Sequence, residues 1–99
     1  MTSLKVAMHG ASGRMGRAVV RLVAEAADLS LAAAIDAPGS QALGADAGDL
    51  AGVGKLEVAV SADLDELARA DVIVDFSLPQ AADALFAAAE RHKKPLVIA

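Results

Sequence analysis

The chain has 99 residues, of which 56% are apolar, with two aromatic residues, no cysteine and a formal net charge of −4. A chain of this length forms one small domain, and its acidic balance and shortage of aromatic rings argue against nucleic acid as a partner. The lack of cysteine excludes disulfides and thiolate metal sites, and because we find neither a signal peptide nor a membrane-spanning run, we expect a cytoplasmic protein without a membrane partner.

The first third of the sequence predicts a strand, a helix and a second strand. Leu4 to His9 is a short apolar run that ends at a glycine, as a buried strand would. The next segment spaces its apolar residues three and four apart, on one face of a helix: Met15, Ala18, Val19, Leu22, Val23 and Ala26. We expect Met15 to lie partly in the core. Leu29 to Ile35 is a second apolar run that ends at Asp36, which completes a βαβ unit.

The middle of the sequence is less regular. Residues 37–56 consist mainly of glycine, alanine and aspartate without a sustained period, which indicates a flexible functional loop with one helical turn around residues 41–43. Residues 57–60 alternate weakly, as in a strand. Asp63 followed by Glu66 has the pattern of a helix N-cap, which predicts a short helix up to Ala70.

The last third predicts two strands around one helix. Residues 72–76 are β-branched or apolar except for Asp75, as in a third buried strand. Residues 77–80 form a second N-cap pattern with proline in the first turn, and the helix that follows has one apolar face: Ala82, Leu85, Phe86 and Ala89. Residues 95–99 are expected to form an edge strand. This alternation predicts an α/β fold, a Rossmann-type doubly wound parallel sheet with the strand order 3-2-1-4-5.

Three glycines, Gly10, Gly13 and Gly16, follow the first strand at intervals of three residues. A strand that turns tightly into a helix presents unpaired backbone N–H groups and the positive end of the helix dipole, which together bind an anion. We expect Gly10 to permit the turn, Gly13 to leave room for a diphosphate and Gly16 to let the helix pack closely on the sheet. Asp36, at the end of the second strand, is placed to bind the adenosine ribose. The pattern predicts a dinucleotide-binding domain over residues 1–99, with purely structural glycines as the alternative.

Asp36 also bears on which coenzyme binds. A carboxylate beside the 2′-phosphate of NADP(H) repels it unless an arginine compensates, and the next two residues, Ala37 and Pro38, supply no positive charge. We therefore predict that NADH is preferred. NADPH remains possible, because Arg14 and Arg17 could turn toward the phosphate.

Three segments, "VAMHGASGRMGR", "GADAGDLAG" and "VIVDFSLP", resemble in order and spacing the N-terminal half of the bacterial 4-hydroxy-tetrahydrodipicolinate reductases (dihydrodipicolinate reductases), enzymes of diaminopimelate and lysine biosynthesis. The resemblance covers essentially the whole chain. Its most specific parts are the Arg-Met-Gly-Arg run at 14–17 and the Asp-Phe-Ser-x-Pro run at 75–79. It implies an oxidoreductase that binds NAD(P)H and delivers hydride to a cyclic unsaturated dicarboxylate.

The resemblance also implies which residues bind the coenzyme: Gly10, Ala11, Ser12, Gly13, Arg14, Met15, Asp36, Phe76 and Ser77. We expect no catalytic residue and no metal ligand in this chain, because the family's His-His and Lys motif and its substrate domain lie C-terminal to this region. The chain is therefore expected to be inactive by itself, with the dicarboxylate bound only by the full-length enzyme, a homotetramer in this family. Ala37 and Leu78 stand where members that use NADPH often carry arginine, which again favours NADH.

Other polar residues are expected to have structural roles. His9 is interpreted as a strand-end residue, although it could contact the diphosphate, and His92 as a positive charge at a helix C-terminus. Asp46 and Asp49 are expected to be solvated rather than metal ligands. Asp75 is expected to bond to nearby loop amides.

Two other function classes fit the same glycine loop. A module that senses NAD(H) without catalysis would differ from a reductase only in the domain that follows. A short-chain dehydrogenase also separates its glycines by two residues, but it uses a Tyr-x-x-x-Lys pair, and this chain has no tyrosine.

Overall fold

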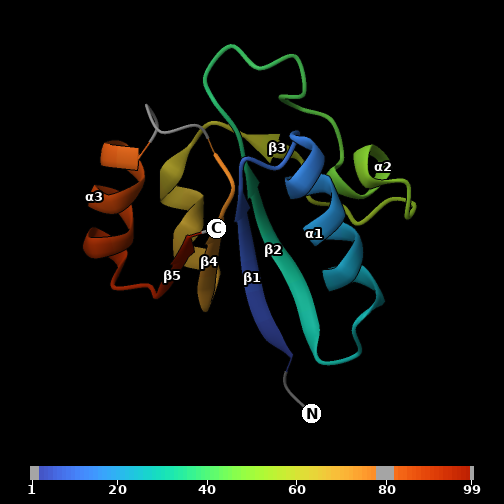
Figure 1. Ribbon diagram of the computed structural model, residues 1–99, viewed down its shortest axis with the longest axis horizontal. Helices are drawn as coiled ribbons and strands as arrows, with labels where there is room; N and C mark the ends of the chain where they lie inside the picture. Colours follow the sequence, from blue (N-terminus) through green and yellow to red (C-terminus); the bar gives the residue numbers. More distant parts are fainter. Residues whose placement is uncertain (1–2, 78–81, 99) are drawn as a thin grey trace.

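Five parallel strands form one sheet in the computed structural model, which describes residues 3–77 and 82–98 (Figure 1). The strands are β1 (Leu4–His9), β2 (Leu29–Ile35), β3 (Val60–Ser61), β4 (Val72–Asp75) and β5 (Leu96–Ile98). They lie in the order β3-β2-β1-β4-β5, and each pairs in parallel with its neighbours. This is the predicted 3-2-1-4-5 order, so the Rossmann-type α/β fold is confirmed.

Helices cover both faces of the sheet (Figure 1). On one face lie α1 (Arg14–Glu25) and the short α2 (Ala47–Ala51), and on the other lie α3 (Ala82–His92) and a 3-10 helix, η1 (Leu64–Arg69). The turns that follow β1, β2 and β4 meet at one edge of the sheet (Figure 1). That edge is where ligands bind in folds of this type.

Side-chain alternation along the central strands supplies two separate cores. On β1, Met8 packs toward α1 and α2, whereas Ala7 packs toward η1 and α3. On β2, Ala34 likewise packs toward α1 and α2, and Ile35 packs toward η1 and α3. Because many of these positions are alanine, the helices lie close to the sheet.

The buried face of α1 is rotated from the predicted one. Its buried residues are spaced by four and three: Gly16, Val20 and Val23. Met15 is 53% exposed, so the prediction that it lies partly in the core is wrong, and Leu22, which was expected on the same apolar face, is 65% exposed. The physical reason is Gly16, whose α-carbon lies against the Gly10 carbonyl oxygen with no room for a side chain between them. This contact fixes the rotation of the helix.

A similar offset occurs in α3. Its buried residues are Leu85, Ala88 and Ala89, and Phe86, which was expected on the buried face, is 43% exposed. The helix packs over the small side chains of Ala7 and Ala33, and this close approach leaves the phenyl ring at the margin. Most of the predicted N-cap pattern at 77–80, and Ala99 of the predicted last strand, lie outside the described residues.

The segment between β2 and β3 is more ordered than predicted. The predicted turn around residues 41–43 is present, but the segment also contains α2. Asp46 caps α2 and is not a solvated carboxylate, because it accepts hydrogen bonds from four backbone N–H groups: those of Gly48, Asp49, Leu56 and Val58, at 2.8 to 3.1 Å. The hydrogen bond from Leu56 is the main cause that holds the pKa of Asp46 below its usual range. The segment therefore contains more regular structure than the flexible loop with one helical turn that was expected.

The elements on either side of η1 differ slightly from the predictions. The strand expected at 57–60 is shorter and later, at Val60–Ser61. The predicted cap at Asp63 is confirmed, since its side chain accepts the N–H of Asp65, but the helix that it starts is a 3-10 helix. His92, at the end of α3, lies 3.1 Å from Asp65.

Candidate functional site

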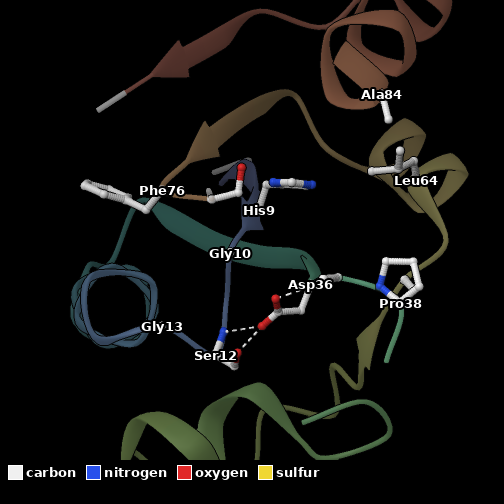
Figure 2. Close-up of a pocket in the computed structure, with 12 residues that line it drawn as sticks. His9, Gly10, Ser12, Gly13, Asp36, Pro38, Leu64, Phe76 and Ala84 are labelled. Atoms are coloured by element: carbon white, nitrogen blue, oxygen red, sulfur yellow. Dashed lines mark hydrogen bonds between the residues drawn. The ribbon is translucent and has the colours of Figure 1, made fainter. Parts of the chain in front are cut away.

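A cavity of about 670 Å³ lies where β1, β2 and β4 end. Six of the nine residues predicted to bind coenzyme line it: Gly10, Ser12, Gly13, Asp36, Phe76 and Ser77. The opposite wall is apolar and includes Pro38, Leu64 and Ala84 (Figure 2). The structure thus brings together residues from three separate segments of the chain at one cavity.

At two of the three positions, 10 and 16, the fold requires glycine for steric reasons. Gly10 has a φ of +87°, and a β-carbon there would lie 2.9 Å from backbone atoms of both Phe76 and Ser77. A β-carbon on Gly16 would overlap the Gly10 carbonyl oxygen. Gly16 therefore allows close packing on the turn, rather than on the sheet as expected.

Gly13 is different. Its φ of −70° and ψ of 165° are accessible to any residue, and a β-carbon would meet only the Gly10 carbonyl oxygen, at an ordinary 3.5 Å. The fold therefore places little demand on glycine at this position. Gly13 lines the cavity, so a side chain here would border that space.

The backbone amides of the turn are engaged within the chain. The N–H groups of residues 10–13 all donate: those of Gly10 and Ala11 to the Ile35 carbonyl oxygen (2.8 and 3.1 Å), that of Ser12 to Asp36 (3.0 Å) and that of Gly13 to the Gly10 carbonyl oxygen (3.2 Å). The expectation of bare amides throughout the turn is therefore wrong. The first N–H groups of α1, at residues 14–16, have no partner within the helix, and no described side chain caps them. An anion would bind at these groups.

Asp36 lies beside the glycine turn. Its Oδ2 accepts hydrogen bonds from both the backbone N–H and the hydroxyl of Ser12, and its Oδ1 accepts the N–H of Ala37 at 2.8 Å (Figure 2). Oδ2 already accepts two hydrogen bonds, whereas Oδ1 accepts one and can accept another. The carboxylate is thus held in place at the cavity wall and can still accept a hydroxyl group through Oδ1.

His9 and Asp75 form a buried pair that sequence reasoning missed. His9 Nδ1 lies 3.1 Å from Asp75 Oδ1, and the two residues are 5% and 6% exposed. The Ser77 N–H donates to the same oxygen at 2.8 Å, which confirms that Asp75 bonds a loop amide. Burial raises the pKa of Asp75, but hydrogen bonds from Ser77 and His9 outweigh burial and hold the pKa below its usual range. The signal was present in the sequence, because His9 and Asp75 end neighbouring parallel strands in register.

Comparison with known proteins identifies the family. A family model described as "Dihydrodipicolinate reductase, N-terminus" matches residues 4–99. The chain belongs to this family. The resemblance seen in the sequence is therefore confirmed.

Three curated relatives, each named 4-hydroxy-tetrahydrodipicolinate reductase, are similar to the chain. The one from Alkalilimnicola ehrlichii is 48% identical over 95 residues, which are 95% of this chain and 36% of the relative. The relative from Saccharophagus degradans is 46% identical over 95 residues, which are 95% of this chain and 35% of the relative. The relative from Halorhodospira halophila is 41% identical over 97 residues, which are 97% of this chain and 36% of the relative. The chain therefore spans about a third of the length of these reductases.

The other predicted residues of this dihydrodipicolinate reductase family member lie off the cavity wall. Ala11 is buried in the core beside α1. Met15 projects to solvent, and Arg14 and Arg17 line a smaller cavity of about 260 Å³ between α1 and α2. This second cavity also includes Arg21, whose guanidinium donates to the Ala51 carbonyl oxygen at 3.0 and 3.2 Å. Arg14 and Met15 contribute two of the first backbone N–H groups of α1, which have no side-chain cap.

Neither a metal cluster nor a membrane-spanning helix is found in residues 3–77 and 82–98 of this family member. No group of three or more His, Cys, Asp or Glu side chains there could hold a metal ion. No helix there is long and apolar enough to cross a membrane.

Proposed function

We propose that this chain is the coenzyme-binding domain of a 4-hydroxy-tetrahydrodipicolinate reductase and that it binds NADH in preference to NADPH. The observation that carries the proposal is the pairing of Gly13 and Asp36 on one cavity. Gly13 leaves a space that the fold does not need, and Asp36 supplies a fixed carboxylate beside that space. The names of the relatives favour a reductase over a non-catalytic NAD(H) sensor.

Three parts of the coenzyme have a counterpart in the site. The first N–H groups of α1 would bind the diphosphate, because the helix dipole favours negative charge there. Asp36 accepts a hydroxyl of the adenosine ribose. The apolar wall formed by Pro38, Leu64 and Ala84 suits the flat face of the adenine ring.

Asp36 also underlies the preference for NADH. A 2′-phosphate would lie near this carboxylate, and none of the described residues that line the cavity is lysine or arginine. Two like charges about 4 Å apart repel by a few kcal/mol at the effective dielectric constant of a protein surface. NADPH is therefore expected to bind more weakly.

The bound nicotinamide supplies hydride in the complete reductase, and this chain's residues bind and orient the coenzyme. Because the chain spans about a third of the relatives' length, we expect it to bind NADH without turning over the dicarboxylate. This expectation is tested by adding the dicarboxylate to the chain with NADH and following absorbance at the nicotinamide band. Steady oxidation of NADH would contradict it.

The test of coenzyme binding is a fluorescence titration with NADH of the parent chain and of Asp36→Ala. We expect the substitution to weaken binding by about 1.5 to 3 kcal/mol, as for a lost hydrogen bond to a charged group. Asp28→Ala is the matched control, because Asp28 is an exposed carboxylate just before β2, at the other end of that strand from Asp36. Equal affinity of all three chains would remove Asp36 from the site, and no binding by the parent would overturn the proposal.

A further inference from the structure

The cavity has an unusual balance of charge for a site that binds a diphosphate. The carboxylate of Asp36 lines it, and that of Asp75 lies behind the His9 ring. Among the described lining residues His9 is the one basic side chain, and residues 78–81 contain no lysine or arginine in the sequence. A dinucleotide brings two further negative charges, and His9 is placed to add positive charge to that of the helix N-terminus.

One ring nitrogen of His9, Nδ1, is hydrogen-bonded to Asp75. It continues the face of β1 on which Ala7 lies, toward η1 and α3, and its ring projects from beside Gly10 toward Leu64 (Figure 2). Asp75 Oδ1 also accepts the Ser77 N–H, and a carboxylate is an acceptor only. The His9 Nδ1 must therefore carry the proton of this hydrogen bond.

The second ring nitrogen then determines the charge of the imidazole. His9 Nε2 has no hydrogen-bond partner among the described residues, and it is not among their fully buried unpartnered atoms. With Nδ1 already protonated, a proton added at Nε2 makes the ring cationic. Nε2 is thus the atom through which the cavity can change its charge.

The groups around His9 make this change sensitive to a ligand. Among the described residues, Asp36 from the end of β2 is the acidic group that lines the cavity, and Asp75 from β4 pairs with His9 without lining it. The elements opposite contribute apolar side chains: Ala62 after β3, Leu64 of η1 and Ala84 of α3. An anionic ligand in the cavity favours a positively charged ring beside it.

We propose that His9 takes up a proton when the diphosphate of a dinucleotide enters the cavity. This inference rests on the proposed function. Because the protonated form binds the ligand more tightly, affinity is highest at low pH. It falls as the pH rises through the range in which the imidazole loses its charge, and then levels off.

The test is calorimetric titration with ADP-ribose, which contains the diphosphate and is stable in mild acid, between pH 5.5 and 8.5. We expect the dissociation constant of the parent chain to rise about tenfold over this range, since an interaction with a charged group is lost. His9→Asn keeps a side-chain N–H for Asp75 but cannot become cationic. Its dissociation constant should stay near the parent's high-pH value throughout.

Two comparisons separate the charge of His9 from a purely structural role. His92→Asn removes the other histidine, which pairs with Asp65 outside the cavity, and should leave the pH profile of the parent unchanged. Asp75→Asn keeps an oxygen that can accept from both His9 and Ser77 but removes the negative charge. The fall in affinity should then move to lower pH, whereas a structural role alone predicts no such shift.

Nuclear magnetic resonance gives a readout independent of affinity. The midpoint at which the His9 ring protons titrate should move to higher pH when ADP-ribose is added, by linkage with binding. Adenosine, which has no charge, should leave it in place. Affinity for ADP-ribose that does not depend on pH, or a pH dependence that persists in His9→Asn, would overturn this inference alone. No binding at any pH would overturn the proposed function as well.

Discussion

The carbonyl oxygen of Gly10 occupies the position that a β-carbon on Gly16 would need. This contact joins the end of β1 to the first turn of α1, so it sets both the rotation of the helix and the direction of its first N–H groups. The glycine spacing is therefore structural at residues 10 and 16, whereas the fold places no such demand on residue 13, for which we propose a role in ligand binding.

We predict that Gly16→Ala destabilises the fold by about 2 to 3 kcal/mol, as for overpacking against atoms that cannot move aside. In an unconstrained helix the same change stabilises by up to about 1 kcal/mol, so the sign of the effect is diagnostic. The measurement is urea unfolding followed by circular dichroism. Arg17→Ala, at the next and exposed position, is the control and should change stability by less than about 0.5 kcal/mol. A Gly16→Ala chain as stable as the parent would contradict the contact.

Gly13→Ala, in contrast to Gly16→Ala, should leave the stability of the fold nearly unchanged and weaken NADH binding. The backbone conformation suits alanine and the new β-carbon makes only an ordinary contact, so we expect the free energy of unfolding to change by less than about 1 kcal/mol. Gly13 lines the cavity, so we expect the added methyl group to crowd the coenzyme and NADH affinity to fall at least about tenfold, or about 1.4 kcal/mol. NADH titration alongside urea unfolding checks both statements. Unchanged affinity in a folded chain would show that the ligand does not approach residue 13.

Ala37→Arg should raise the affinity for NADPH. Ala37 is exposed, lines the cavity and follows Asp36 directly, so an arginine here can neutralise the carboxylate and pair with a 2′-phosphate. Because the position is exposed, we expect NADPH binding to strengthen by about 1 kcal/mol, which is close to a fivefold gain in affinity. The affinity for NADH should change little. Ala37→Gln, which has length without charge, is the control. A gain of equal size with glutamine, or one that survives 0.5 M salt, would contradict an electrostatic cause.

Asp46 should make the stability of the α2 segment dependent on pH. Hydrogen bonds, chiefly from the Leu56 N–H, hold the pKa of Asp46 in the folded chain below its usual range. A carboxyl of this kind stabilises the fold at neutral pH, and that contribution is lost as the pH falls below about 4 and through the lowered folded value. Asp46→Ala should therefore be less stable than the parent at pH 7, and the difference should shrink in acid. Urea unfolding at pH 3 to 7 measures it.

The neighbouring Asp49 provides the control for that experiment. Asp49 is exposed on the same short helix, and only its backbone N–H donates to Asp46. Asp49→Ala should show little loss of stability at any pH. Amide exchange should also be faster in Asp46→Ala than in Asp49→Ala at residues 48, 56 and 58, if the carboxylate holds that segment together.

Predictions from the sequence were most accurate where residues close together in the chain determine the structure. The ends of β1 and β2 match the predicted runs, because Gly10 and Asp36 terminate them. The strand order followed from the alternation of elements and the preference for right-handed crossovers. The glycine spacing and Asp36 were enough to locate the cavity.

The sequence-based predictions were wrong or incomplete where contacts between residues distant in the sequence determine the structure. The rotation of α1 depends on the contact of Gly16 with the turn, which the apolar spacing of the helix does not contain. Order in residues 46–58 depends on a carboxylate that bonds amides up to 12 residues away. The pair of His9 and Asp75 depends on strand register. A histidine and an aspartate at the ends of two adjacent strands are worth testing as a pair in other sequences of this fold.

The Ile35 carbonyl oxygen, which accepts the N–H groups of both Gly10 and Ala11, ties the end of β2 to the glycine turn. The next residue, Asp36, bonds Ser12 of the same turn. Under the proposed function, the residue that binds the sugar and the turn that binds the diphosphate are therefore already joined by hydrogen bonds before a ligand arrives. We expect association to be fast and nearly free of reorganisation, so that differences in affinity among variants of the site arise mainly in the rate at which the ligand departs.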